Sequence, residues 1–130
     1  MKASKKTIKK TTRLAEQKRA KIKRAAVKLF SINGYVATTI RQIASAASIE
    51  GGSFYYHFTS KMDLLESIFD EGNNLLLEAA TAALDDSSLQ PKEAFRQLIY
   101  SHLKIVEFDQ DQFIVVTREL QRLTGRSKRN

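Results

Sequence analysis

The scarcity of helix-breaking residues constrains this chain more than any other feature of its sequence. The 130 residues include one proline, Pro91, and five glycines, most of which fall between apolar segments. Proline and interior glycine are the residues that most strongly disfavour a helix, so long stretches without them favour helices. A chain of this length fits one domain, or one domain and part of a second. We therefore expect an all-α protein.

Apolar residues at helical spacing divide the chain into helices. Ile22, Ala26 and Phe30 recur every four residues and mark one face of the first helix. Thr39 and Gln42 have the spacing of a capping box, which predicts the start of the second helix. The run at 113–116 is rich in β-branched residues, but the apolar stripe continues beyond it at helical spacing. The predicted helices cover residues 12–32, 39–47, 51–57, 60–84, 91–108 and 112–123.

Positive charge is concentrated at the start of the chain. Residues 1–28 contain twelve Lys or Arg residues and a single acid, Glu16, whereas the remaining residues contain ten bases and thirteen acids. Such an asymmetry points to a polyanionic partner, either a nucleic acid or an anionic membrane surface. We expect residues 1–11 to form a basic flexible arm that precedes the folded part.

Several classes of protein are excluded or disfavoured by composition. The chain has no cysteine, which excludes disulfides and thiol chemistry, and no apolar run approaches the ~18 residues of a membrane span. The basic N-terminus is not followed by the apolar segment of a secretory signal, so we expect a cytoplasmic protein. His57 and His102 are the only histidines, and no nucleophile–base pair is apparent. We expect no metal, no cofactor, no catalytic residue and no enzymatic activity.

Two short helices joined by a tight turn, behind a longer one, predict a helix-turn-helix. In that motif the second short helix enters the major groove of DNA. Gly51 and Gly52 stand at its start, and each costs roughly 1 kcal/mol relative to alanine inside a helix. Their presence suggests that another molecule approaches the backbone closely there. Phe54 and Phe58 are the expected core anchors of this helix.

The side chains around this short helix are suited to DNA. Ser53 is small enough to lie against a base edge, and a lysine in the next helix can meet a phosphate. Hydroxyl, phenol and imidazole groups supply further hydrogen-bond donors. The candidates from this reasoning are Thr39, Ser53, Tyr55, Tyr56, His57 and Lys61.

Residues 26–69 resemble the DNA-binding domain of the TetR family of bacterial transcriptional regulators. The resemblance rests on Leu29-Phe30, Asn33-Gly34-Tyr35, Thr38-Thr39-Ile40-Arg41, Ile43-Ala44, Tyr55-Tyr56-His57-Phe58 and Ser60-Lys61. It implies a three-helix DNA-binding domain over residues 12–59. Residues 60–130 would then hold a connecting helix and the first two helices of a TetR-like regulatory domain, with the rest of that domain missing.

The resemblance also implies roles for individual positions. Thr39 and Lys61 would contact phosphate, and Arg41 would reach the DNA backbone or a guanine edge. Gly52 and Ser53 would face the groove. Tyr55, Tyr56 and His57 would contact phosphates or base edges.

The implied activity is binding of a homodimer to a near-palindromic operator in double-stranded DNA, with repression of transcription. A small apolar or acyl-CoA-like effector would release the DNA in full-length relatives, and no membrane partner is expected. The sequence differs from the usual TetR pattern at one place: the family often has Ser-Lys where this chain has Glu50-Gly51. Glu50 would repel phosphate, and the basic N-terminal segment would compensate. The alternative is a non-specific module for nucleic acids or anionic surfaces.

Overall fold

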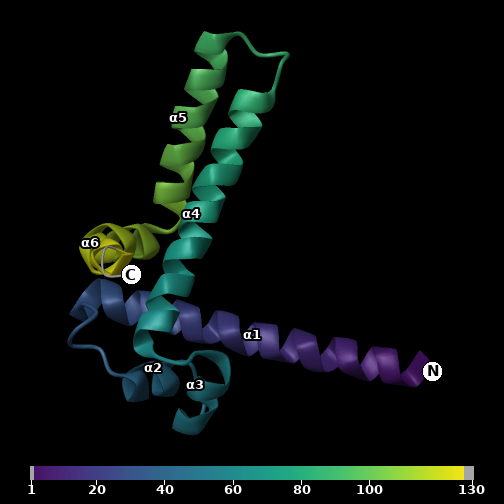
Figure 1. Ribbon diagram of the computed structural model, residues 1–130, viewed down its shortest axis with the longest axis vertical. Helices are drawn as coiled ribbons and strands as arrows, with labels where there is room; N and C mark the ends of the chain where they lie inside the picture. Colours follow the sequence, from purple (N-terminus) through teal and green to yellow (C-terminus); the bar gives the residue numbers. More distant parts are fainter. Residues whose placement is uncertain (1, 128–130) are drawn as a thin grey trace. The chain divides into compact units, whose positions relative to one another are not determined.

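The structure is a computed structural model that describes the backbone of residues 2–127 and the side chains of residues 11–107 and 109–124. Within that part of the chain all regular structure is helical, as the sequence predicts (Figure 1). The chain divides into two compact units, residues 1–65 and 66–130, which are described separately below. The helices are α1 (Lys2–Asn33), α2 (Ile40–Ala46), α3 (Gly51–His57), α4 (Lys61–Asp85), α5 (Pro91–Phe108) and α6 (Gln110–Ser127).

The first helix is longer than the sequence predicts. It begins at Lys2 instead of near residue 12, so the segment expected as a flexible arm is helical. Lysine and alanine are good helix formers, and no glycine or proline interrupts the chain before Gly34. Gly34 then ends α1 with a φ of 82°, in the left-handed region that favours glycine, and its N–H donates to the carbonyl of Phe30 at 2.9 Å.

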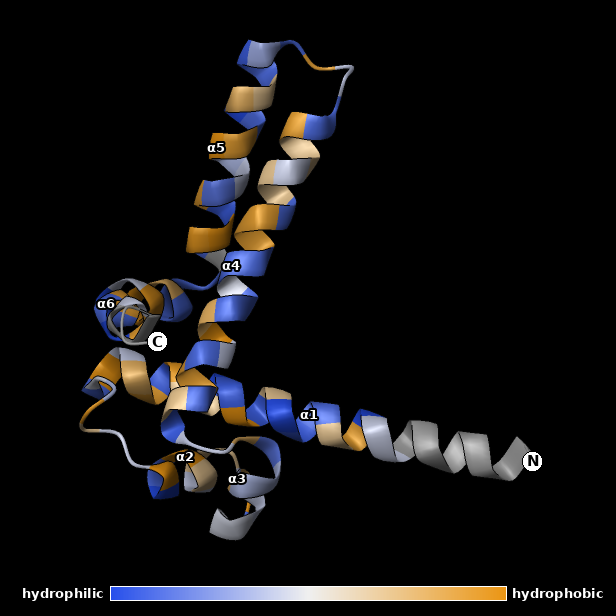
Figure 2. Cartoon of the chain, in the orientation of Figure 1, coloured by the Kyte–Doolittle hydropathy of each residue, from blue (hydrophilic) through white to orange (hydrophobic). Residues whose placement is uncertain are grey.

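The core of the first unit is built from the faces that the apolar spacing predicts. Ile22, Ala26 and Phe30 of α1 are buried, as is Ile43 of α2. Figure 2 shows hydrophobic residues (orange) on both of these helices. Phe54 and Phe58, at the two ends of the last turn of α3, are also buried, which confirms them as anchors. Burying one such side chain contributes roughly 1.5–3 kcal/mol, so this core fixes how α3 sits against α1 and α2.

The capping box at the start of α2 is present. The backbone N–H of Gln42 donates to Thr39 Oγ1 at 3.2 Å, and the N–H of Thr39 donates to Gln42 Oε1 at 2.8 Å. The Thr39 hydroxyl also donates to Gln42 Oε1 at 3.0 Å. These bonds satisfy donors that a helix of seven residues would otherwise leave unpaired at its first turn.

Replacing the cap should destabilise the first unit. We expect Thr39→Ala to cost about 1 kcal/mol of unfolding free energy, because the Gln42 N–H loses its acceptor. Thr39→Ser keeps the hydroxyl and should retain most of that stability. Urea denaturation of the three proteins measures the difference, and equal midpoints for all three would contradict the capping role.

The second unit is a helical hairpin followed by α6. The turn between α4 and α5 is closed by Asp86, whose carboxylate accepts from the Ser88 N–H at 2.9 Å, and Pro91 occupies the first turn of α5. Gln112 of α6 donates from Nε2 to the carbonyl of Ile68 on α4 at 3.2 Å. A Cβ at Gly72 would lie 2.9 Å from the same nitrogen, so glycine allows this approach. The segment 113–116 is helical, as predicted.

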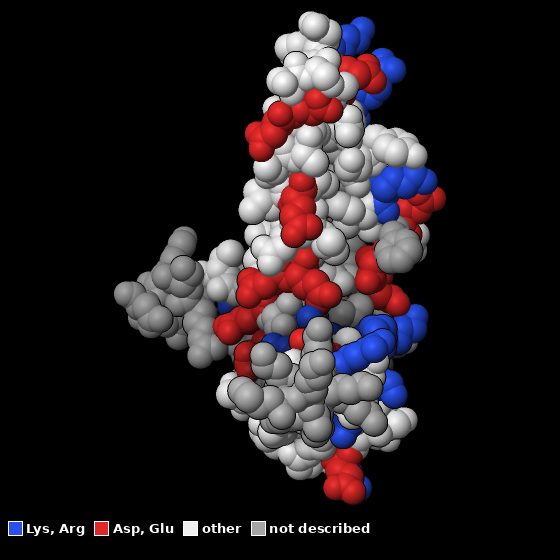
Figure 3. Space-filling model, turned by 90° about the vertical axis from the view of Figure 1, so that its right-hand side faces the viewer, with Lys and Arg blue, Asp and Glu red and all other residues white. Residues whose placement is uncertain are grey.

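Helix α5 of the second unit exposes large apolar side chains, and acidic residues outnumber basic ones in the second unit. Phe95 and Leu103 of α5 are 63% and 61% exposed, although they lie on its predicted inner face. Residues 62–117 contain three basic and eleven acidic residues, and acidic side chains are spread over the upper part of the molecule in Figure 3, where α4 and α5 lie. Within the described residues no helix is both long and apolar enough to span a bilayer.

Candidate nucleic-acid interface

The short helix α3 presents one face to the core and the other to solvent. Phe54 and Phe58 are at most 1% exposed, whereas Tyr55 and Tyr56 between them are 60% and 81% exposed. The Tyr55 ring meets the Phe54 ring edge-on, with centroids 5.4 Å apart. Two phenols therefore project from a helix whose position is fixed by two buried rings, and each phenol can donate to or accept from a ligand.

The glycines at the start of α3 are not required by the packing of this chain. A Cβ placed on Gly51 or Gly52 would meet no heavy atom within 4 Å, and neither residue has a positive φ. Both residues are exposed. The protein would gain helix stability from alanine at either position. Packing within the described residues therefore does not explain why glycine stands at either position.

His57 closes α3, and its surroundings favour the neutral form of the imidazole. Burial lowers the pKa of its imidazole, and the nearby charges of Lys18 and Arg19 lower this pKa further. The ring of Tyr56 stands edge-on to the imidazole, with centroids 5.1 Å apart. A phosphate at this position would favour the imidazolium, so binding there would be coupled to proton uptake.

Arg19 is a positioning residue that the sequence analysis did not identify. Its guanidinium donates from a terminal nitrogen to the carbonyl of His57 and lies over the Phe58 ring, 4.0 Å from the centroid. A cation at the C-terminal end of α3 is favoured by the helix dipole. Arg19 thereby holds α3 against α1. No sequence signal distinguishes it from the other bases of the N-terminal segment, because only the fold brings residues 19 and 57 together.

Thr39 and Arg41 occupy the start of α2. The Thr39 hydroxyl is already used as a donor and an acceptor within the capping box. Arg41 is exposed on the surface of the helix. Ser53, one turn into α3, is half-buried, and its N–H donates to the carbonyl of Glu50 at 2.9 Å. The exposed Glu50 is the N-cap of α3 and makes no side-chain capping bond.

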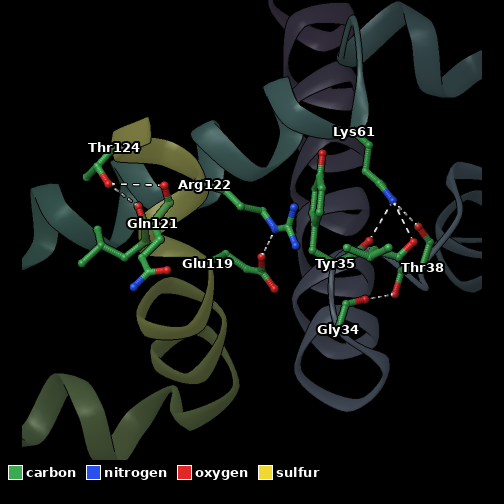
Figure 4. A network of polar contacts seen from close by, with 10 residues as sticks. Gly34, Tyr35, Thr38, Lys61, Glu119, Gln121, Arg122 and Thr124 are labelled. Carbon is green, nitrogen blue, oxygen red and sulfur yellow. Dashed lines mark hydrogen bonds and ion pairs between the residues drawn. The ribbon is translucent and has the colours of Figure 1, made fainter. Parts of the chain in front are cut away.

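Lys61 contacts backbone carbonyls of the protein, whereas the sequence predicts that it contacts a DNA phosphate. Its ammonium donates to the carbonyls of Tyr35 and Thr38, each at 2.7 Å, and to that of Val36 at 3.5 Å (Figure 4). It also lies 4.4 Å from the centroid of the Tyr35 ring. An ammonium has three N–H donors, so a phosphate contact would require giving up one of these bonds.

The loop that Lys61 holds leads directly into α2. Thr38 is fully buried, and its hydroxyl donates to the carbonyl of Gly34 at 2.8 Å and approaches that of Leu29 at 3.3 Å. Lys61 thus ties the first turn of α4 to the segment that sets where α2 begins. Of the predicted site residues, the structure gathers Gly52, Ser53 and residues 55–57 on α3, with Thr39 and Arg41 on the preceding helix.

Comparison with known proteins identifies the domain that carries these residues. The family described as "Bacterial regulatory proteins, tetR family" matches residues 22–68, which run from the middle of α1 into α4. Residues 22–68 form a DNA-binding domain of the TetR family. This confirms the resemblance found in the sequence, and the matched segment contains all eight predicted DNA-binding residues.

Individual TetR relatives extend the similarity beyond that segment. The transcriptional repressor KstR2 of Mycobacterium tuberculosis is 30% identical over 111 residues, 85% of this chain and 55% of the relative. The regulator TtgR of Pseudomonas putida is 28% identical over 92 residues, 71% of this chain and 44% of the relative. The solved structure of the ketosteroid transcriptional regulator KstR2 superposes with a TM-score of 0.76 at 28% identity and covers 82% of this chain and 54% of that one.

The chain thus spans about half the length of the TetR relatives that it matches. The helical fold and the order of its parts, a helix-turn-helix domain followed by further helices, are confirmed by these similarities.

Proposed function

We propose that this chain reads DNA as part of a TetR-type transcriptional repressor. Gly52 and Ser53 lie against the bases of a major groove, and Tyr55, Tyr56 and His57 contact phosphates or base edges. Arg41 and Thr39 approach the backbone from α2. The relatives named as transcriptional repressors and regulators support this assignment.

The observation that carries the proposal is the outer face of α3. It combines glycines that no internal contact requires with two phenols that are 60% and 81% exposed, on a helix anchored by buried rings. A monomeric protein has no structural reason to combine costly glycines with exposed aromatic rings on one short helix. A close-fitting groove lined with phosphates accounts for both features.

Selection of binding sites from random duplex DNA tests the proposal. We expect a two-fold symmetric consensus whose half-sites are about one helical turn apart, because a dimer presents two copies of α3 to successive major grooves. Ser53→Tyr should remove the consensus while leaving the helix content unchanged. If the unaltered protein enriched no consensus sequence, sequence-specific recognition of DNA would be contradicted.

The exposed apolar side chains of α5 support the homodimer in this proposal. Phe95, Leu103 and Ile99 lie on one helix and are 63%, 61% and 46% exposed. An apolar face of this kind on a soluble protein marks an interaction surface. A second copy of the chain is the partner that two-fold symmetric binding requires.

A cavity in the second unit supports an apolar effector. It has a volume of about 900 Å³, lies between α4, α5 and α6, and is lined by Phe69, Leu76, Ile105, Phe113 and Val116 among others. The relatives include a ketosteroid regulator and a fatty acid metabolism regulator of Bacillus subtilis. We therefore propose a lipid-like effector, such as an acyl-CoA, that releases DNA by binding one conformation of the protein more tightly than the other. Addition of palmitoyl-CoA tests this proposal. If it changed neither the melting temperature of the protein nor its binding to DNA, an acyl-CoA effector would be contradicted.

The pH dependence of DNA binding tests the role of His57. Because burial and two nearby cations lower its pKa in the free protein, a phosphate contact should draw a proton onto the imidazole. We expect affinity for a fixed duplex to rise several-fold as pH falls from 7.5 to 6, and His57→Gln to remove that rise. The free protein should show the opposite trend in stability, since the unfolded state binds the proton more readily below the ordinary pKa of 6.5. An affinity that is independent of pH would contradict a phosphate contact at His57.

A further inference from the structure

Glu50 carries an exposed carboxylate at the start of α3. Residues 1–65 contain fourteen basic residues and three acidic ones, Glu16, Glu50 and Asp63. Asp63 takes part in the fold, because its Oδ2 accepts from the N–H of Thr59 at 2.7 Å and from the Thr59 hydroxyl at 3.1 Å. The side chain of Glu50 makes no hydrogen bond or ion pair with any of the described residues. Its carboxylate is therefore not held by the fold.

The stability of α3 does not account for a glutamate at residue 50. The residue is the N-cap of this helix, with an extended backbone at φ −68° and ψ 145°. Aspartate, asparagine and serine are preferred at such a position, because their short side chains accept a hydrogen bond from the first turn. The helix dipole favours any acid there, but aspartate would supply that charge and a capping bond as well. Glutamate instead carries its carboxylate one methylene farther from the backbone.

The carboxylate of Glu50 lies at the end of α3 that the proposed function directs at the bases, and the present inference rests on that function. In a helix-turn-helix the N-terminal residues of the second helix contact base edges. The N–H of Ser53 donates to the carbonyl of Glu50 at 2.9 Å, so Glu50 is one helical turn from a residue proposed to face the groove. The next two residues, Gly51 and Gly52, have no side chains that could cover it.

A carboxylate in the major groove discriminates between bases. It accepts hydrogen bonds but does not donate them, so phosphates repel it, as do the acceptors at guanine N7 and O6 and at thymine O4. Cytosine and adenine present amino groups that can donate to it. Adenine N6 lies beside the acceptor N7, whereas cytosine presents N4 without an acceptor on the same base edge. Cytosine is therefore the base that best compensates a carboxylate.

We propose that Glu50 accepts a hydrogen bond from the N4 amino group of a cytosine and thereby specifies one C·G base pair. The two-fold symmetry of the proposed dimer places one such pair in each half of the operator. The same carboxylate weakens binding to DNA that lacks the cytosine, because its charge is then left facing phosphates and acceptors. Glu50 is thus a specificity-determining residue in addition to Gly52 and Ser53.

Selection of binding sites with the parent and with two variants of Glu50 tests the inference. We expect the parent consensus to contain a C·G pair that Glu50→Ala no longer selects, while the rest of the consensus is retained. Glutamine has nearly the size of glutamate but offers both a donor and an acceptor, which match N7 and N6 of adenine. Glu50→Gln should therefore select an A·T pair at the same position, with adenine in place of cytosine.

Two operator duplexes that differ only at this base pair measure the size of the effect. The parent should bind the C·G duplex about tenfold more tightly than the A·T duplex. Glu50→Ala should bind the two within about twofold, and Glu50→Gln should favour the A·T duplex. Glu16→Gln is the matched control, because it removes the same charge from an exposed acid of α1 in the same unit, and it should keep the tenfold preference. Melting curves from circular dichroism check that each protein is folded.

Several results would overturn the inference. If Glu50→Ala still selected the C·G pair, or if both variants bound every sequence more tightly by one common factor, Glu50 would only repel phosphates. Loss of selection at an A·T pair would contradict a contact with cytosine. These outcomes would leave the proposed function standing, since the parent would still select a consensus. If the parent selected no consensus, the proposed function would fail and this inference would fail with it.

Discussion

Gly52→Ala should make the protein more stable and poorer at binding DNA. Alanine is favoured over glycine inside a helix by about 1 kcal/mol, and a Cβ at residue 52 meets no protein atom within 4 Å. The melting temperature should therefore rise by several degrees. Affinity for the selected operator should fall at least about tenfold, equivalent to ~1.4 kcal/mol, because the added methyl group occupies the space that a base edge requires.

Gly51→Ala is the matched control for this prediction. Its Cβ also meets open space, and its backbone also gains from alanine, but it is not among the residues proposed to face the groove. We expect it to stabilise the protein while affecting binding much less. Thermal denaturation and titration of a fluorescent operator duplex measure both effects. If Gly52→Ala bound the operator as tightly as the parent, the proposed orientation of α3 in the groove would be wrong.

Lys61→Met should reveal whether this lysine holds the fold or contacts DNA. We expect the free energy of unfolding to fall by about 1–2 kcal/mol, because two carbonyls at 2.7 Å lose a charged donor. Operator affinity should fall as well, since the loop that sets the start of α2 loses its attachment. The slope of log affinity against log salt on non-specific DNA should stay unchanged, whereas loss of one phosphate contact would reduce it by ~0.9.

Lys61→Arg separates the two roles. Arginine retains the positive charge and could still meet a phosphate, but its planar guanidinium does not match carbonyls that converge on a compact ammonium. If Lys61 positions the loop, arginine should be nearly as damaging as methionine in both stability and operator affinity. Restoration of full operator affinity by arginine would show that the charge, and not the loop contacts, is what matters.

Local patterns in the sequence predicted most of the helical architecture. The Thr39–Gln42 capping box, the stop at Gly34 and the buried Phe54 and Phe58 follow from interactions within a few residues or from apolar periodicity. Such signals depend on the backbone geometry of one helix, which the order of residues specifies directly. The start of α1 differs from the sequence prediction, because the helix begins at Lys2 instead of near residue 12 and lysine favours helix formation.

Contacts between residues far apart in the chain determined the features that these local patterns do not predict. Arg19 meets His57 and Lys61 meets Tyr35 and Thr38 only because the three-helix core brings α1, α3 and α4 together. The sequence determined that this chain is helical, that its bases cluster at one end and that it carries the motif of a DNA reader. The tertiary structure decided which bases hold the fold and which remain on the surface, because a long charged side chain binds whichever partner the packing places within its reach.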